Sequence, residues 1–163
     1  MTQRIPALAI SVITVLIGAA AAFQASTEIP TMAYTHVLTR YLSHRVLYVL
    51  GCVIYVAVFV AWAFVSDALA TALIRLVIGV GFALAYVASV QIADDLAPAH
   101  LRATAQALVK AVGFGLAPIA GALGGGLIYG AVGSRAMFLA AAVVTAVAGV
   151  VALVALPART RRV

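Results

Sequence analysis

The sequence predicts an all-α, polytopic membrane protein with about five transmembrane helices. Of its 163 residues, 66% are hydrophobic and only 9% are charged, and the mean hydropathy is +1.22. Soluble domains carry about 25% charged residues, so this chain has too few charges to cover a water-facing surface. Its apolar residues also gather in runs of the length that a membrane helix needs, about 20 residues. We therefore expect the outer surface of the protein to face lipid.

Five apolar runs predict the spans, and only short segments separate them. The predicted spans are residues 7–38, 46–65, 69–93, 103–129 and 136–156. The first run is too long for one straight span at 1.5 Å per residue, so we expect it to be tilted and kinked, or frayed at its start. An alternative is a signal peptide over residues 1–22, with Arg4 before an apolar stretch that ends in three alanines. Because no linker interrupts the chain, we expect one transmembrane domain over residues 1–163.

The basic residues predict the orientation of the spans. Ten Lys and Arg against four Asp and Glu give a formal net charge of +6. In a soluble protein this balance would suggest nucleic acid, but here the bases gather at helix ends, so we interpret them as topological anchors and expect no nucleic-acid partner. The positive-inside rule places the loops 40–45 and 94–102 and the tail 157–163 on the cytoplasmic side. With five spans, the N-terminus is then outside and the C-terminus is cytoplasmic.

Polar side chains share one face on three of the spans. At 100° per residue, such faces occur on the first, third and fourth spans. Because polar groups inside a membrane are costly, they usually face the bundle interior or a water-filled cavity. The residues that we expect to line a substrate or proton pathway are Gln24, Glu28, Arg75, Tyr86, Gln106 and Lys110. For Arg75 and Lys110 the alternative is snorkelling to the interface.

The second and fifth spans carry no such polar face. We therefore expect them to be supports on the lipid side, with Val58 and Val147 as examples of lipid-facing positions. The fourth span also carries small residues at a spacing of four, which lets two helix backbones approach closely. The glycines that we expect in such helix packing are Gly121, Gly125, Gly126 and Gly130.

The chain carries no recognisable catalytic or metal-binding motif. There is no HExxH, GxSxG or nucleotide-binding loop, and the three histidines lack metal-ligand spacing. We therefore expect neither enzymatic activity nor a cofactor or metal. Transport needs only binding and conformational change, so this lack of motifs favours a transporter over a membrane enzyme.

Several ordered motifs resemble the major facilitator superfamily of transporters. Glu28-Ile29-Pro30 and the basic loop 40–45 resemble the superfamily's eighth helix and the loop after it. Residues 97–108 resemble the loop into the eleventh helix, and residues 124–138 resemble its end and the turn into the twelfth. The most similar subgroup is that of lactose-permease-like and phenylpropionate-permease-like symporters, with sugar efflux transporters nearby. The basic loop lacks the Gly and the acidic residue of the superfamily's loop signature.

The resemblance implies a specific fold and function. The five spans would be helices eight to twelve, which form most of a six-helix half-bundle with the ninth and twelfth helices at its periphery. The chain would be the C-terminal part of a secondary transporter in the inner membrane, proton-coupled and carrying a sugar, an aromatic acid or a drug-like solute. Because substrate binds between two halves, it would be incomplete alone, and its partners would be the bilayer, the solute and either the missing N-terminal half or a second copy.

Two residues stand out for the coupling chemistry that this resemblance implies. Burial raises the pKa of a carboxyl group in general, so Glu28 is the candidate carrier of a coupling proton. Glu28 and Lys110 are the expected functional pair, because each lies within a span and away from the nearest loop. The alternatives are a non-transporting structural or assembly subunit, or a truncated gene product.

Overall fold

The computed structural model describes the backbone of residues 4–156, and the side chains within that range except those of residues 4–13, 16, 17, 20, 36 and 68. Within these residues the chain is helical and contains no strand. The elements are α1 (Arg4–Tyr41), α2 (His44–Phe64), α3 (Ala68–Leu96), a 3-10 turn η1 (Ala99–Leu101), α4 (Arg102–Lys110), a π-helical segment η2 (Ala111–Leu116), α5 (Ala117–Val132) and α6 (Ser134–Ala155). The basic tail 157–163, used above to predict orientation, lies outside the described residues.

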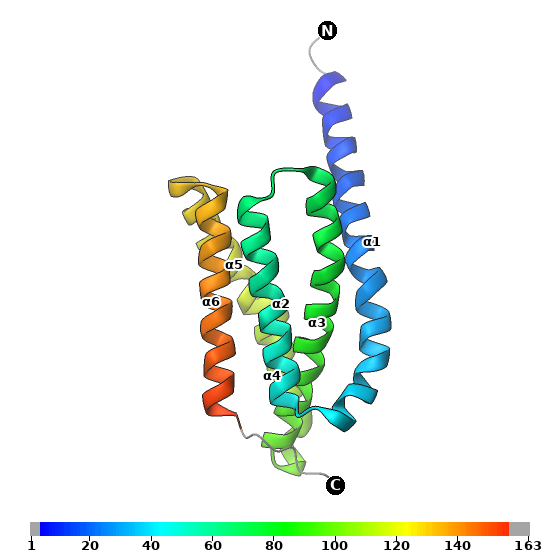
Figure 1. Ribbon diagram of the computed structural model, residues 1–163, viewed down its shortest axis with the longest axis vertical. Coiled ribbons are helices and arrows are strands. Elements are labelled where there is room, and N and C mark those ends of the chain that lie inside the picture. Colours follow the sequence, from blue (N-terminus) through cyan, green and yellow to red (C-terminus); the bar gives the residue numbers. More distant parts are fainter. Residues whose placement is uncertain (1–3, 157–163) are drawn as a thin grey trace.

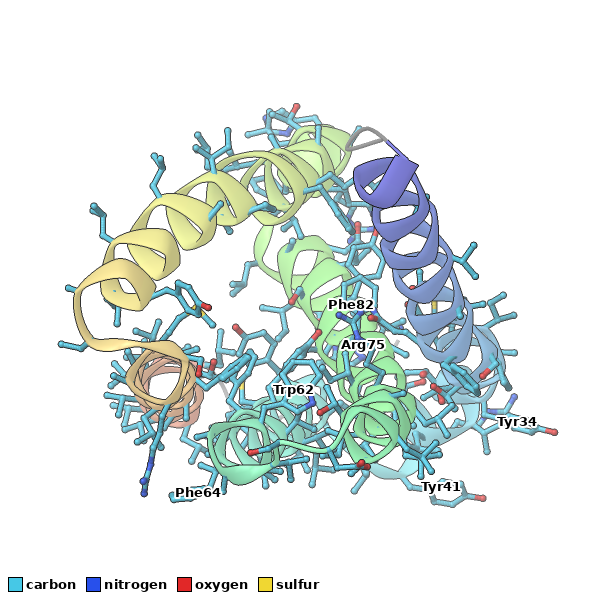
Figure 2. All side chains as sticks on the ribbon, turned by 90° about the horizontal axis from the view of Figure 1, so that it is seen from above. Tyr34, Tyr41, Trp62, Phe64, Arg75 and Phe82 are labelled. Carbon is cyan, nitrogen blue, oxygen red and sulfur yellow. The ribbon has the colours of Figure 1, made fainter. Side chains whose placement is uncertain are left out.

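The helices run alternately up and down, as short connections require (Figure 1). The main contacts join α1 to α3, α3 to α2 and α2 to α6, which places these four helices in a row. The elements α4, η2 and α5 form one continuous helical stretch that returns across this row. Its first part, α4, contacts α3, and its last part, α5, contacts α6. Seen from above, this stretch arches over an interior bordered by α3, α2 and α6 (Figure 2).

The helix ends follow from local capping. The Ser43 hydroxyl accepts a hydrogen bond from the Val46 N–H (3.4 Å) and begins α2, and the Asp67 carboxylate accepts one from the Ala70 N–H (2.7 Å) and begins α3. Gly133 separates α5 from α6 with φ +87°, a conformation that favours glycine. These caps make the tight turns that bring successive helices side by side.

Four helical stretches in the described part of the chain are long and apolar enough to cross a membrane. They are His44–Phe64, Leu69–Leu96, Ala99–Val132 and Ser134–Ala155. The first predicted span is α1, a continuous helix of 38 residues with Pro30 inside it, or roughly 57 Å at 1.5 Å per residue. It exceeds the ~30 Å hydrocarbon core, and its upper part extends beyond the α2–α3 connection (Figure 1). The predicted all-α polytopic membrane fold is confirmed.

The central position of α2 corrects one expectation. This helix was predicted to be a lipid-side support, yet it lies between α3 and α6, and Val58 is only 3% exposed. Small residues on two sides of α2 explain the difference. A Cβ at Gly51 would lie 2.8 Å from the Ala85 Cβ on α3, and the Cys52 Cβ would lie 3.2 Å from a Cβ at Gly149 on α6. In contrast, Val147 on α6 is 56% exposed, as expected of a lipid-facing position.

Three of the four glycines predicted for helix packing in the fourth span face no other helix among the described residues, and the fourth, Gly125, faces only a side chain of α6. A Cβ at three of them would meet nothing within 4 Å, and one at Gly125 would meet only the Met137 side chain, at 3.8 Å. The three glycines in open space are Gly121, Gly126 and Gly130. The predicted close packing is therefore not found among the described residues. The physical reason is the course of the arch α4–η2–α5, whose backbone approaches α3 and α6 mainly near its two ends. Across its middle the Phe114 side chain reaches α3, but the three open glycines meet no helix.

The π-helical segment in the middle of this arch has a local cause. Pro118 has no N–H to donate to the carbonyl of Phe114, so the regular α-helical ladder cannot continue there. Instead, the Ala117 N–H bonds to the Val112 carbonyl, five residues earlier. Such π-helical turns are rare and occur frequently at functional sites.

Candidate functional site

The polar face predicted for the first span is mostly a helix contact. The Thr27 hydroxyl donates to the Leu76 carbonyl on α3 (2.7 Å), across a point where Gly79 leaves room for it. Thr35, on the same face, is 1% exposed, and its hydroxyl donates to the Thr31 carbonyl (2.6 Å). This face therefore joins α1 to α3 through the Thr27 hydrogen bond, while the Thr35 hydroxyl is satisfied within α1.

Gln24 and Glu28 belong to the same contact. The Gln24 carbonyl lies 3.0 Å from the Thr27 hydroxyl and is a second, longer acceptor for the same hydrogen, and the Gln24 side chain is half-buried. Glu28 is also half-buried. No cation among the described residues forms an ion pair with Glu28. Glu28 is thus an acid within a helix, at the edge of the α1–α3 contact.

Arg75 lies among aromatic rings near the upper end of α3. Its guanidinium is 5.8 Å from the centroid of the Trp62 ring on α2, and Trp62 in turn is 5.5 Å from the Phe138 ring on α6. Figure 2 shows Arg75 and Trp62 facing each other beside the interior. The Trp62 indole nitrogen is buried without a hydrogen-bond partner in the described part of the chain. A cation over an aromatic face is stabilised by the ring quadrupole, so the Trp62 ring holds Arg75, which has no ion pair with a carboxylate in the described part of the chain.

Tyr86 contacts the arch rather than another polar residue. Its ring stacks on Phe82 at 5.6 Å and meets the Phe114 ring edge-on at 5.5 Å. Phe114 belongs to the π-helical segment, so this cluster of three rings is where α3 touches the middle of the arch. The contact couples the position of the π-helical segment to one face of α3.

A pocket of about 460 Å³ opens below this ring cluster, between α2, α3, α4 and α6. Tyr48 and Ser89 bring hydroxyl groups to its lining, and the rest is aliphatic, including Ile92, Val109 and Val151. The Ser89 hydroxyl already donates to the Ala85 carbonyl (2.7 Å). The volume of the pocket lies in the range of small-molecule sites, about 300–1,000 Å³.

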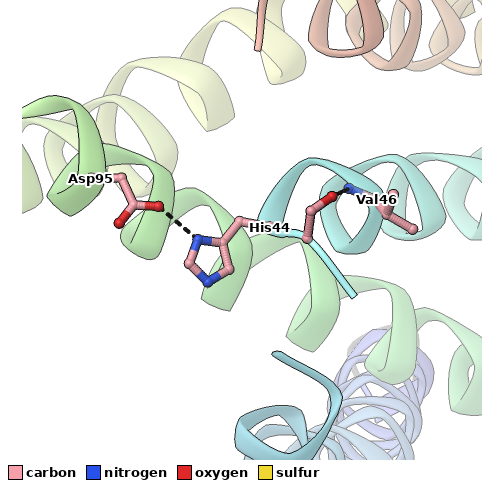
Figure 3. Close-up of polar contacts among 4 residues, drawn as sticks. His44, Val46 and Asp95 are labelled. Carbon is pink, nitrogen blue, oxygen red and sulfur yellow. Dashed lines mark hydrogen bonds and ion pairs between the residues drawn. The ribbon is translucent and has the colours of Figure 1, made fainter. Parts of the chain in front are cut away.

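The lower end of the bundle carries a set of polar contacts between helices. His44 Nδ1 at the start of α2 lies 2.8 Å from the Asp95 carboxylate at the end of α3 (Figure 3). Asp94 accepts a hydrogen bond from the Gln106 amide on α4 (3.3 Å) and lies 3.9 Å from Arg102. Gln106, predicted to line a pathway, therefore ties α4 to α3. Both aspartates have these partners while their side chains stay partly exposed, 42% for Asp95 and 39% for Asp94.

Arg45 adds a further connection at this end. Its Nη1 donates to the carbonyls of Leu153 (3.1 Å) and Leu156 (3.2 Å) at the end of α6. A cation is favourable at a helix C-terminus, where carbonyl groups lack helical partners. Together with the His44 contact, this places the start of α2 beside the ends of α3 and α6. The basic loops around residues 40–45 and 97–102 thus share one end of the bundle.

The six predicted pathway residues therefore lie in separate places. Gln24 and Glu28 flank the α1–α3 contact, Arg75 and Tyr86 face aromatic rings, and Gln106 binds Asp94. Lys110 is exposed on the arch and forms no ion pair with Glu28 or any other described acid. No group of three potential metal ligands occurs among the described residues.

The comparisons with known proteins identify the family. The model of the "MFS_1 like family" matches residues 11–140. This chain belongs to the MFS_1-like family. The resemblance to the major facilitator superfamily is thereby confirmed, while the symporter subgroup and the numbering of the helices stay predictions. Neither the curated proteins nor the solved structures contain a match. As a member of this family, the chain is a multi-pass membrane protein related to transporters rather than enzymes.

Proposed function

We propose that this chain supplies helices eight to twelve, the C-terminal part, of a secondary transporter for a small organic solute, and that it is incomplete alone. The observation that carries the proposal is the exposure of α4–η2–α5, which has no buried residue although it is apolar enough to span a membrane. A membrane helix with a polar residue and several glycines on its surface is suited to contact another protein surface. Either a missing N-terminal half or a second copy fits this face.

The energetics of Lys110 support the same conclusion. A lysine at the centre of a membrane helix costs about 2.5–3.5 kcal/mol when it faces lipid. Lys110 is exposed and has no ion-pair partner among the described residues. That cost is avoided where the arch borders a water-filled cavity between two halves. The open glycines of the same span, Gly121, Gly126 and Gly130, are then available to pack against the partner.

Glu28 is the proposed carrier of a coupling proton. It is the only acidic residue within the five predicted spans. Its carboxylate has no cation partner among the described residues that would hold it charged. A carboxyl group that alternates between a buried and a hydrated position exchanges its proton, because desolvation favours the neutral form.

The accessibility test uses the single native thiol. With Cys52 replaced by alanine, single cysteines at Glu28 and Lys110 should react with a small polar maleimide in native membranes. A cysteine at Val147 on the exposed face of α6 should not react, since its surroundings are lipid. Equal labelling at the three positions would contradict the proposed pathway.

The transport test measures solute-driven proton movement. Inverted membrane vesicles carrying the chain and its natural membrane partners are exposed to a sugar, an aromatic acid and a cationic dye, with a pH-sensitive fluorophore inside. We expect Glu28→Gln to abolish proton movement while membrane insertion is unchanged. Vesicles that contain only the purified monomeric chain should show no uptake, and uptake by the monomer would refute the idea that it is incomplete.

A structural or assembly subunit is the second candidate function. The exposed arch favours it equally, because association with another protein requires the same surface. The two candidates differ in the vesicle experiment. For an assembly subunit, Glu28→Gln would leave every measured flux unchanged, while a bulky substitution at Gly126 would still disrupt the association.

A further inference from the structure

A second hollow lies on the opposite side of α6 from the pocket described above. This groove of about 250 Å³ runs between α2 and α6. Its rims are aliphatic and consist of Val49, Val53 and Val56 on α2 and Ala146, Val150 and Leu153 on α6. Val53 is 58% exposed and Val150 is 59% exposed. The groove therefore opens on the outer surface of two helices that can span a membrane.

The floor of the groove explains why it is empty of side chains. Gly149 and Cys52 meet there, and a Cβ at Gly149 would lie only 3.2 Å from the Cys52 Cβ. The two helices thus approach most closely where both residues are small. The valines on either side stand above this contact and leave an apolar channel along it.

A cation lies at the lower end of the groove. Arg45 precedes Val49 by four residues, so both share one face of α2. Its Nη1 bonds to the carbonyl of Leu153, which is itself a rim residue of the groove. Its Nε is buried without a hydrogen-bond partner among the described residues. The apolar channel therefore ends beside a guanidinium that is itself only partly buried.

The length of this arrangement matches one leaflet of a bilayer. From Arg45 to Val56 the helix rises roughly 16 Å at 1.5 Å per residue, about half of the ~30 Å hydrocarbon core. A cation at the membrane surface, followed by an apolar channel that ends near the midplane, complements a lipid with a negative headgroup. A parallel second copy on the same groove would bring two Arg45 side chains together, which like-charge repulsion disfavours.

We propose that the α2–α6 groove binds one anionic phospholipid, with its phosphate at Arg45 and an acyl chain along the valine rims. Arginine suits this role because its planar fork of donors matches phosphate oxygens. The lipid site lies on the outer face of the bundle and is independent of the proposed transport function.

The test titrates the delipidated, detergent-solubilised chain with phosphatidylglycerol or phosphatidylcholine and counts bound lipids by native mass spectrometry. We expect one phosphatidylglycerol to bind more tightly than phosphatidylcholine. Arg45→Gln should weaken that binding by about tenfold, equivalent to about 1.4 kcal/mol, and remove the preference. Val53→Trp and Val150→Trp, which fill the groove from its two walls, should each prevent binding of this lipid.

Two matched substitutions serve as controls. Arg40→Gln removes an exposed arginine at the same end of the bundle, and Val144→Trp enlarges an exposed α6 residue that does not line the groove. Both should bind phosphatidylglycerol as the native chain does, and circular dichroism verifies that each variant is folded. Equal affinity for the two lipids overturns the proposal, as does unchanged binding in Arg45→Gln or in both tryptophan variants. A dimer that is lost in Val53→Trp, with no bound lipid, would assign the groove to a second copy and overturn it too.

Discussion

Gly79 on α3 provides a direct test of how α1 docks. A methyl group at this position would overlap the Thr27 hydroxyl and the Gln24 carbonyl of α1, and it would lie 3.0 Å from the Glu28 backbone nitrogen. Two of these three atoms belong to the backbone and cannot rotate away. Gly79→Ala therefore forces α1 away from α3 and breaks the hydrogen bond from Thr27 to Leu76, which is 2.7 Å long.

The magnitude combines a steric cost, a broken hydrogen bond and a gain in helix propensity. Overpacking of this kind costs about 1–3 kcal/mol, and an interhelical hydrogen bond in a membrane contributes about 0.6–1.7 kcal/mol. Alanine recovers about 1 kcal/mol through its higher helix propensity. The expected net decrease in the free energy of unfolding is thus about 1–4 kcal/mol. Gly126→Ala is the matched control, because a Cβ there meets nothing within 4 Å, and it should be neutral or stabilise by up to about 1 kcal/mol.

The assay is reversible unfolding by sodium dodecyl sulfate in mixed micelles, followed by far-ultraviolet circular dichroism. Gly79→Ala should lower the unfolding midpoint. Gly126→Ala should raise the midpoint or leave it unchanged. A Gly79→Ala variant within about 0.5 kcal/mol of the native chain, less than the smallest overpacking cost, would refute the described α1–α3 contact. Equal destabilisation by Gly126→Ala would show that the arch packs against a helix of this chain after all.

The other predictions concern topology, the ring cluster and the lower polar contacts. Reporter fusions after Asp67 and at Val163 should lie on opposite sides of the membrane, because three spans separate them, and a common side would contradict that number. A double-mutant cycle with Tyr86→Ala and Phe114→Ala should give a coupling free energy of about 0.5–1.5 kcal/mol, and zero coupling would mean that the rings do not hold the arch. His44→Ala should lower the free energy of unfolding by no more than about 1 kcal/mol, since Asp95 is partly exposed, and a larger decrease in the same unfolding assay would contradict a weak, solvent-screened pair.

The sequence by itself determined the class of the protein and the succession of its helices. In lipid every backbone polar group needs a partner within the protein, so long apolar runs fold as helices with few alternatives. Short connections then force neighbouring helices to run in opposite directions. That is why the basic loops near Arg45 and Arg102 were expected at one end of the bundle, where the structure places them. The family could likewise be predicted, because its motifs are local in sequence.

Only the tertiary structure decided which helix faces touch each other. A polar face with a period of 3.6 residues suits a cavity and a helix contact equally well, and the Thr27 face of α1 proved to be a contact with α3. His44 and Asp95 are 51 residues apart, so no local pattern predicts their pairing. Apolar side chains carry little information about neighbours in a bilayer, because lipid tails are as apolar as they are. Close approach is instead set by small residues such as Gly79 and Gly51, whose effect depends on what lies opposite them in space.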